Sequence, residues 1–296
     1  MPFGLTTKFK KSLLHSSIKN QMKRQNCDID LDTLSCTSNF NFSNRVTIKS
    51  NNKFGDCYLG NNVYSGENNS FGNATQLHDY VRVEENCNIG VNVNIQRGAK
   101  IGSGCKIGDD VSIEENTKIG AHTTIGNKSV LQDNVTIGDD VQIGNDVTIG
   151  GGATIGGSSV LENNAHLYPN TKLSTKCVIE ESVKIGENTT IGNKVTIGKG
   201  TQIGEDTAIE NYIFIGKDVK VGKNCAIAEN IPDGFDIPDN TLVNLKWISN
   251  IDFLPLDSSK PSKIAEIINN LNIDKPQETP AQNSDKKVII PTNYRP

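Results

Sequence analysis

The stretch VQIGNDVTIGGGATIGG, residues 141–157, repeats a branched apolar residue followed by glycine every six residues. Counting in steps of six from Ile149 meets an Ile, Leu or Val anchor at every position from Leu77 to Ile227. Phe71 and Leu59 extend the series upstream, although Ser65 interrupts it. Helices do not have this spacing, whereas a short strand followed by a bend does.

Two further positions of the hexad are selective. The residue two before each anchor is small or β-branched, as in Cys105, Val111 and Thr117. In a strand this residue faces the same side as the anchor, so both are expected to point inward. The residue three before each anchor is mostly Asn, Asp or Gly, which tolerate left-handed backbone angles at a corner. Hexads this short must stack in coils to bury a core.

The chain therefore resembles the hexapeptide-repeat (left-handed parallel β-helix) acyltransferase family. This resemblance implies an all-β solenoid with three hexads per triangular coil and a left-handed winding. About nine to ten coils are expected. The sequence divides into a basic amphipathic helix (1–27), short strands or an irregular N-terminal cap (28–56), the β-helix (57–230), a C-terminal cap with a short helix (231–274) and a disordered tail (275–296).

Charge and composition limit the function classes. The net charge is −4, although residues 1–27 carry only basic charged residues. The helix predicted there is expected to pack on the solenoid or on another subunit, and weak membrane-surface contact is the alternative. The solenoid has neither the basic groove nor the interleaved aromatic residues of a nucleic-acid-binding protein. No apolar run is long enough to span a membrane, and no secretory signal is evident. Several of the seven cysteines occupy inward positions of the hexads, and none has the spacing typical of a metal site. A cytoplasmic protein without a metal is expected.

The family resemblance implies acyl transfer from acetyl-coenzyme A to a sugar or another small amine or hydroxyl compound. It also implies a homotrimer, with a His general base in a cleft between subunits. An imidazole suits that role because its pKa lies near neutral pH. Three histidines of the solenoid are alternative candidates for this one base: His78, His122 and His166.

Each histidine also has a structural alternative. His78, in QLHDYVRV, resembles the I-H-x-x-A-x-I opening of the serine and sugar acetyltransferases of the family, but Asp79 stands where those enzymes have Pro. Asp79 is a candidate for orienting the imidazole. His122, in GAHTTIG, occupies a corner position, and His166, in NNAHLYPN, is predicted to face outward from a strand. A solvated corner or an exposed strand residue is the simpler explanation for each of them.

Coenzyme A would need cations for its phosphates, and the family usually places them near the C-terminal coils. The candidates there are Lys194, Lys199, Lys217, Lys220 and Lys223. Lysines on solvent-exposed faces of a solenoid are common, because they discourage edge aggregation. The uninterrupted register, without the protruding loops of many family enzymes, favours an alternative: a non-catalytic structural or interaction solenoid.

One outward face carries an apolar stripe. Val160, Val178 and Phe214, with Thr196 between the last two, are predicted to follow one another on successive coils. We expect either neighbouring subunits or the C-terminal segment of the chain to cover this stripe.

Overall fold

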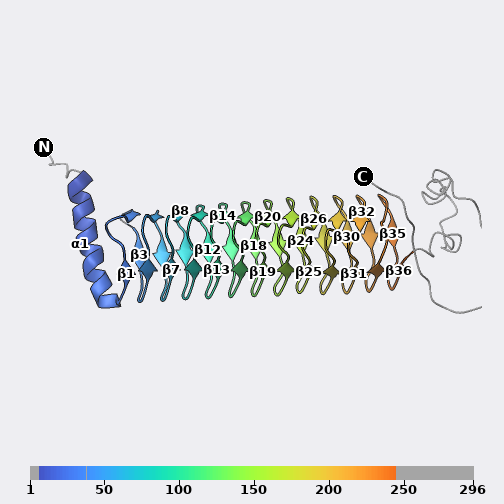
Figure 1. Cartoon of the computed structure of the whole chain (residues 1–296), viewed down its shortest axis with the longest axis horizontal. Helices are drawn as coiled ribbons and strands as arrows, with labels where there is room; N and C mark the ends of the chain where they lie inside the picture. Colours follow the sequence, from blue (N-terminus) through green and yellow to red (C-terminus); the bar gives the residue numbers. More distant parts are fainter. Residues whose placement is uncertain (1–6, 38, 245–296) are drawn as a thin grey trace, which may run out of the picture.

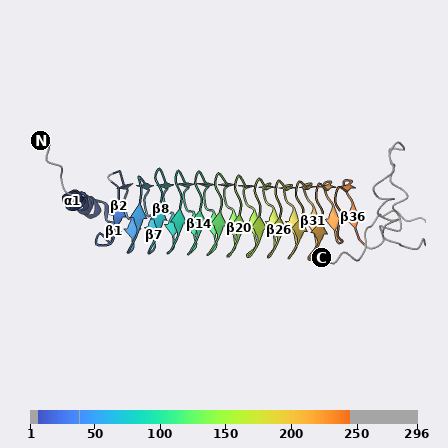
Figure 2. The same ribbon diagram turned by 90° about the horizontal axis from the view of Figure 1, so that it is seen from above.

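The protein is a straight solenoid of three parallel sheets with one helix at its N-terminal end (Figures 1 and 2). The structure, a computed structural model, describes residues 7–37 and 39–244, with side chains from residue 16 onward. Each coil contributes one two-residue strand to each sheet, except that the last coil adds only the isolated bridge of Ile231 to the second sheet. The three sheets are named A, B and C below, in the order in which the chain visits them.

Sheet A has 13 strands: β1 (Asp28–Ile29), β4 (Thr47–Ile48), β7 (Tyr64–Ser65), β10 (Arg82–Val83), β13 (Lys100–Ile101), β16 (Lys118–Ile119), β19 (Thr136–Ile137), β22 (Thr154–Ile155), β25 (Lys172–Leu173), β28 (Thr190–Ile191), β31 (Ala208–Ile209), β34 (Ala226–Ile227) and β36 (Leu242–Val243). Sheet B has 11: β2 (Ser35–Cys36), β5 (Lys53–Phe54), β8 (Ser70–Phe71), β11 (Asn88–Ile89), β14 (Lys106–Ile107), β17 (Thr124–Ile125), β20 (Gln142–Ile143), β23 (Val160–Leu161), β26 (Val178–Ile179), β29 (Thr196–Ile197) and β32 (Phe214–Ile215). Sheet C has 12: β3 (Asn41–Phe42), β6 (Tyr58–Leu59), β9 (Gln76–Leu77), β12 (Asn94–Ile95), β15 (Ser112–Ile113), β18 (Val130–Leu131), β21 (Thr148–Ile149), β24 (His166–Leu167), β27 (Lys184–Ile185), β30 (Gln202–Ile203), β33 (Lys220–Val221) and β35 (Asp236–Ile237).

The register stacks equivalent hexad positions on one another. In β19 and β22, Thr136 pairs with Thr154 and Ile137 pairs with Ile155, so outward residues and anchors form separate rows. The anchors are buried; Ile149, for example, is 0% exposed. Burying each such side chain contributes about 1.5–3 kcal/mol of transfer free energy. The predicted fold class, an all-β parallel β-helix with three hexads per coil, is confirmed.

The corners explain why Asn and Asp recur. Asn134 has a φ of 61°, and its backbone N–H donates to the carbonyl of Glu115 in the preceding coil at 2.8 Å. A second corner position uses the side chain instead: Oδ1 of Asn145 accepts from the backbone N–H of Asn127 at 2.8 Å. The left-handed position was predicted from the sequence, whereas this ladder of side-chain acceptors was not.

The glycine after the anchor has a steric cause. A Cβ added to Gly126 would lie 2.5 Å from the carbonyl carbon and oxygen of Gly144 in the next coil. That distance is far below van der Waals contact. The Ile-Gly theme therefore combines one residue that fills the interior with one that lets adjacent coils approach.

The number of coils is about twelve, and the predicted nine to ten is too few. Residues 28–56, where short strands or an irregular cap are predicted, form strands β1 to β5 of the solenoid. The anchors Phe54 and Leu59 are five residues apart instead of six, so a strict count in sixes loses the register there.

The C-terminal boundary of the solenoid also lies further along the chain than predicted. Ile231 bridges to Ile215, and the predicted cap that starts at residue 231 continues the sheets with β35 and β36. The remainder of that cap, its short helix and the tail at 275–296 lie outside the described residues.

Helix α1 (Thr7–Gln25) lies across the N-terminal end of the solenoid (Figure 1). Ile18 is buried, and the side-chain amide of Gln21 donates to the carbonyl of Phe42 at 2.8 Å. Behind it, the rings of Phe54 and Phe71 stack at a centroid distance of 4.5 Å. The helix thereby covers part of the first coil, whose apolar interior would otherwise face water.

Ser65, the residue that interrupts the apolar series, belongs to a buried polar cluster. Its hydroxyl donates to Oδ1 of Asn52 at 2.8 Å and accepts from Nδ2 of Asn69 at 3.1 Å. Asn52 Nδ2 donates in turn to the carbonyls of Lys49 and Gly66. All three cluster side chains are at most 1% exposed, so each hydrogen bond replaces one to water.

Candidate functional site

The three candidate histidines lie on different parts of the solenoid. His78 follows β9 at the corner between sheets C and A, His122 follows β16 at the corner between sheets A and B, and His166 is in β24 on sheet C. His78 and His166 are about five coils apart, roughly 24 Å along the axis. Within one chain, the structure therefore does not bring the three imidazoles together.

His78 and Asp79 have separate partners. The half-buried imidazole of His78 places Nε2 3.0 Å from Oδ1 of Asn94. The carboxylate of Asp79 accepts from both the backbone N–H and the side-chain amide of Asn61, at 2.6 and 3.0 Å. Asp79 thus belongs to the ladder of corner side chains, where its carboxylate accepts hydrogen bonds from Asn61 of the preceding coil.

His122 fills a corner position. Its φ is 57°, its side chain is exposed, and its backbone N–H donates to the carbonyl of Ser103 at 2.8 Å. The ring lies over Gly104, where an added Cβ would be 2.5 Å from Nδ1 of His122. These contacts account for His122 without a catalytic role.

His166 has the most unusual environment of the three. The half-buried imidazole contacts the ring of Tyr168 at a centroid distance of 4.3 Å, and Lys184 is its in-register neighbour in β27. Partial burial, and secondarily the charge of Lys184, lower the pKa of His166 below its ordinary value. Both effects favour the neutral imidazole, in which one ring nitrogen can accept a proton.

The five candidate lysines do not form one cluster. Lys194 is at the corner between sheets A and B, Lys220 is in β33 on sheet C, and Lys223 is at the corner between sheets C and A. Only Lys199 and Lys217 share a corner, between sheets B and C, one coil apart.

Three of these lysines already have partners. Lys199 pairs with Glu181 at 2.6 Å, and Lys223 pairs with Glu205 at 2.8 Å. Nζ of Lys194 lies 5.1 Å from the ring centroid of Tyr212. Within residues 16–37 and 39–244, Lys217 and Lys220 make no ion pair, so they are the members of the set with charges still available.

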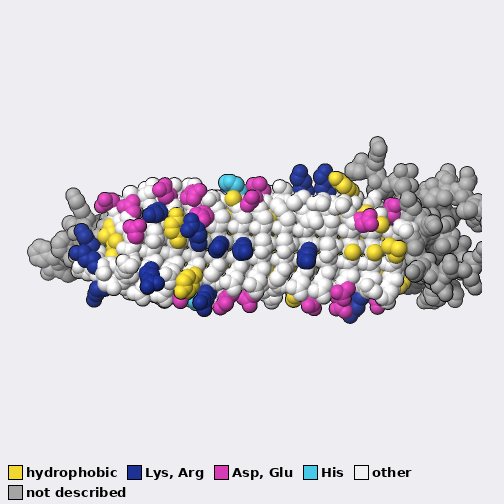
Figure 3. Space-filling view, turned by 60° about the horizontal axis from the view of Figure 1, so that its bottom comes forward, with side chains coloured by type: hydrophobic (Ala, Val, Ile, Leu, Met, Phe, Trp, Pro, Cys, Tyr) yellow, Lys and Arg dark blue, Asp and Glu magenta, His cyan; other side chains and the backbone are white. Residues whose placement is uncertain are grey.

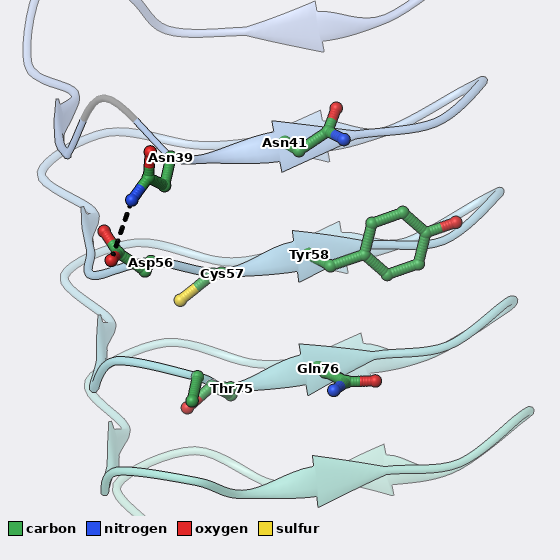
Figure 4. A pocket seen from close by; sticks show the side chains of 8 residues that line it. Asn39, Asn41, Asp56, Cys57, Tyr58, Thr75 and Gln76 are labelled. Atoms are coloured by element: carbon green, nitrogen blue, oxygen red, sulfur yellow. Dashed lines mark hydrogen bonds between the residues drawn. The ribbon is translucent and has the colours of Figure 1, made fainter.

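A groove of about 400 Å³ lies near the N-terminal end of the solenoid, where the predicted cap (28–56) meets the predicted β-helix (57–230). Asn41, Tyr58 and Gln76 line it from successive strands of sheet C, and Asn39 donates to Asp56 at 3.0 Å beside them (Figure 4). Hydrogen bonds lower the pKa of Asp56. The sequence pattern does not indicate this groove, because its walls form only when residues from separate coils lie side by side.

The cysteines are buried in the solenoid or partly exposed near its N-terminus, and all are free thiols. Burial raises the pKa of Cys57 to about 12, which keeps this thiol protonated and unreactive. In the part of the chain with defined placement, no group of three or more His, Cys, Asp or Glu side chains is arranged to hold a metal ion. The same part contains no helix that is long and apolar enough to cross a bilayer.

Comparison with protein families identifies the repeat. The model for "Bacterial transferase hexapeptide (six repeats)" matches residues 92–127 and 122–163, and the model for "Hexapeptide repeat of succinyl-transferase" matches residues 182–216. These matches confirm the hexapeptide repeats inferred from the sequence. No curated protein matches the chain.

Solved structures with a similar arrangement include several acyltransferases. A UDP-N-acetylglucosamine acyltransferase from Bacteroides fragilis is 21% identical over 54% of this chain and 68% of its own, with a TM-score of 0.35. One from Arabidopsis is 13% identical over 70% and 69%, with a TM-score of 0.32. A perosamine N-acetyltransferase from Caulobacter crescentus, bound to CoA and GDP-perosamine, is 19% identical over 39% and 52%, with a TM-score of 0.22. At these similarities no residue role is transferred to this chain.

Proposed function

We propose that this hexapeptide-repeat protein is an acyltransferase of the cytoplasm, with acetyl-coenzyme A as donor and a sugar or another small amine or hydroxyl compound as acceptor. The matching families are described as transferases, which supports the reaction class. The seven free thiols are consistent with a reducing compartment.

The observation that carries the proposal is the environment of His166. A general base must be unprotonated before the reaction, and the lowered pKa of His166 favours that state. The neutral imidazole removes the proton of the acceptor as the acceptor attacks the thioester carbonyl. The carbon–sulfur bond then breaks, and the imidazolium returns the proton to the leaving thiolate. Lys184 beside His166 disfavours the imidazolium, which makes the final proton transfer easier.

The proposed assembly is a homotrimer. Val160, Val178 and Thr196 lie in successive in-register strands of sheet B, followed by Phe214, which is 39% exposed. An apolar row of this kind is suited to contact with a second subunit. Because one chain offers His166 only an open sheet face, the cleft around it would need a wall from a neighbouring subunit.

The first experiment is titration of the protein with acetyl-coenzyme A by calorimetry, up to millimolar donor. Heat of binding is expected, and its absence would reject the donor. Lys217 and Lys220 are the available cations, so the Lys217→Gln/Lys220→Gln variant should bind more weakly than wild type. A matched control is Lys53→Gln/Lys106→Gln, which removes the same charge from sheet B.

The second experiment identifies the base. His166→Gln should lower turnover by about 10²–10⁴-fold with unchanged donor affinity. His78→Gln and His122→Gln serve as matched controls and should keep near-normal rates. If one of these controls abolishes turnover instead, the base has been misassigned. If all three variants remain active, a histidine-based mechanism is rejected.

A second candidate function is a non-catalytic interaction solenoid. The regularity of the coils favours it: from β7 to β34 every strand follows the previous one after six residues, without a protruding loop. A protein of this kind would bind no acetyl-coenzyme A in the calorimetric titration, so the same measurement separates the two functions.

A further inference from the structure

Sheet A carries a run of positive charges on its outward row. Arg82 pairs in register with Lys100, and Lys100 pairs with Lys118. Like charges directly opposite each other on neighbouring strands destabilise a sheet. The outward lysines of sheet B are separated by Ser70 and Asn88, so consecutive cations are not a requirement of the fold. The row Arg82, Lys100 and Lys118 is called the basic strip below.

The strip is only partly neutralised within the chain. Arg82 forms two hydrogen bonds with the carboxylate of Glu84 and lies 4.0 Å from the ring centroid of Tyr64. Lys100 and Lys118 are exposed, and neither makes an ion pair with any residue whose side chain the structure describes. Two adjacent, unpaired ammonium groups therefore point away from a straight sheet face.

Other positive charges lie at the same end of the molecule, separated from the strip along sheet A by Asp28, Thr47 and Tyr64. Figure 3 shows dark-blue side chains from the helical end along the middle of the visible face, with most acidic side chains at its edges. Lys23 and Arg24 in the last turn of α1 are exposed, as is Arg45 at the corner between sheets C and A. The backbone N–H of Arg45 donates to the carbonyl of Gln25, which ties the end of α1 to this corner.

We propose that the basic strip, together with the end of α1, docks on a membrane surface that contains anionic lipids. Lys100 and Lys118, the two unpaired cations of the strip, are in register on a straight sheet and can contact neighbouring negative headgroups at the same time. Each basic residue near such a surface adds to the attraction, and the sum falls off within a Debye length. This docking is peripheral and does not depend on the proposed enzymatic activity.

The test is cosedimentation of the full chain with vesicles. The probes are vesicles of phosphatidylcholine with phosphatidylserine and vesicles of phosphatidylcholine alone. Wild type should bind only the former and should dissociate at high salt. Lys100→Gln/Lys118→Gln should bind about 30-fold more weakly, since each basic residue accounts for about a fivefold factor. The control Lys53→Gln/Lys106→Gln, with the same net charge but changes on sheet B, should bind like wild type.

Other outcomes would overturn the proposal. Equal weakening of both double variants would show that net charge alone drives the association. Binding to both vesicle types would show that negative headgroups are not recognised. If heparin, a soluble polyanion, binds in a strip-dependent manner while the vesicles do not, the partner is a linear polyanion instead of a membrane. Circular dichroism of both variants shows whether the solenoid remains folded.

Discussion

Replacing Ser65 by Ala should destabilise the N-terminal coils more than the loss of one hydroxyl implies. The hydroxyl is the hydrogen-bond partner of Oδ1 of Asn52 and Nδ2 of Asn69, and neither atom has another partner among the described residues. Both amides are at most 1% exposed, so water cannot replace the lost partner. Each buried polar atom left without a partner costs about 1–3 kcal/mol. The expected loss in free energy of unfolding is therefore about 2–6 kcal/mol.

A triple variant distinguishes the contribution of the polar cluster to stability from that of the surrounding sheet. Thr201 stands in the same inward position as Asn52 and Asn69, where its hydroxyl donates to the carbonyl of Gly216 and accepts from a backbone N–H of the next coil. Asn52→Thr/Ser65→Ile/Asn69→Thr would impose this regular pattern on the irregular coils. We expect stability close to wild type, because every partner of the cluster is replaced together.

Stability should be measured locally as well as globally. Solenoid repeats contact only their neighbours, so a defect in one coil need not appear in the whole unfolding curve. Denaturant unfolding followed by circular dichroism should be combined with hydrogen exchange of peptides covering residues 52–87. If Ser65→Ala changes neither the free energy of global unfolding nor that of local opening by more than about 1 kcal/mol, the cluster does not contribute as described. A triple variant less stable than Ser65→Ala would contradict the same reasoning.

Three further predictions concern the faces and corners. In an NMR titration, the pKa of His166 should lie below that of an ordinary histidine, and Lys184→Ala should raise it only in part, since the burial remains. Because the pKa is lowered in the folded state, His166 should contribute stability above its unfolded-state pKa, and this stability should be lost as the pH falls through the folded-state pKa. An unshifted titration would contradict this reasoning. Val178→Lys should reduce either the molar mass measured by light scattering or the melting temperature. Thr124→Lys, three coils closer to the N-terminus on the same sheet, should change neither quantity. If both quantities are unchanged for Val178→Lys, the stripe is simply exposed to solvent. His122→Val should lower stability by about 1–2 kcal/mol, because a β-branched residue is poorly suited to a φ of 57°, and a melting temperature equal to wild type would refute that explanation.

The sequence alone determined the repeating unit. The anchors, the inward partners two residues before them and the left-handed corner positions follow from local rules, which a strand and a bend obey wherever they occur. Ile149 and Asn134 could therefore be assigned correctly without knowing what they contact. The outward row on sheet B containing Val178 was predicted in the same way, since the coil period relates each row to every third hexad.

The tertiary structure decided everything that depends on contact between coils. The five-residue step from Phe54 to Leu59 became visible only because β5 and β6 pair with the next coil in register. The lowered pKa of His166 likewise depends on burial and on Lys184, which is distant in sequence and adjacent in the sheet. A hexad pattern specifies which way each side chain points, but its neighbours are fixed by stacking, since residues from separate hexads meet only when the coils close.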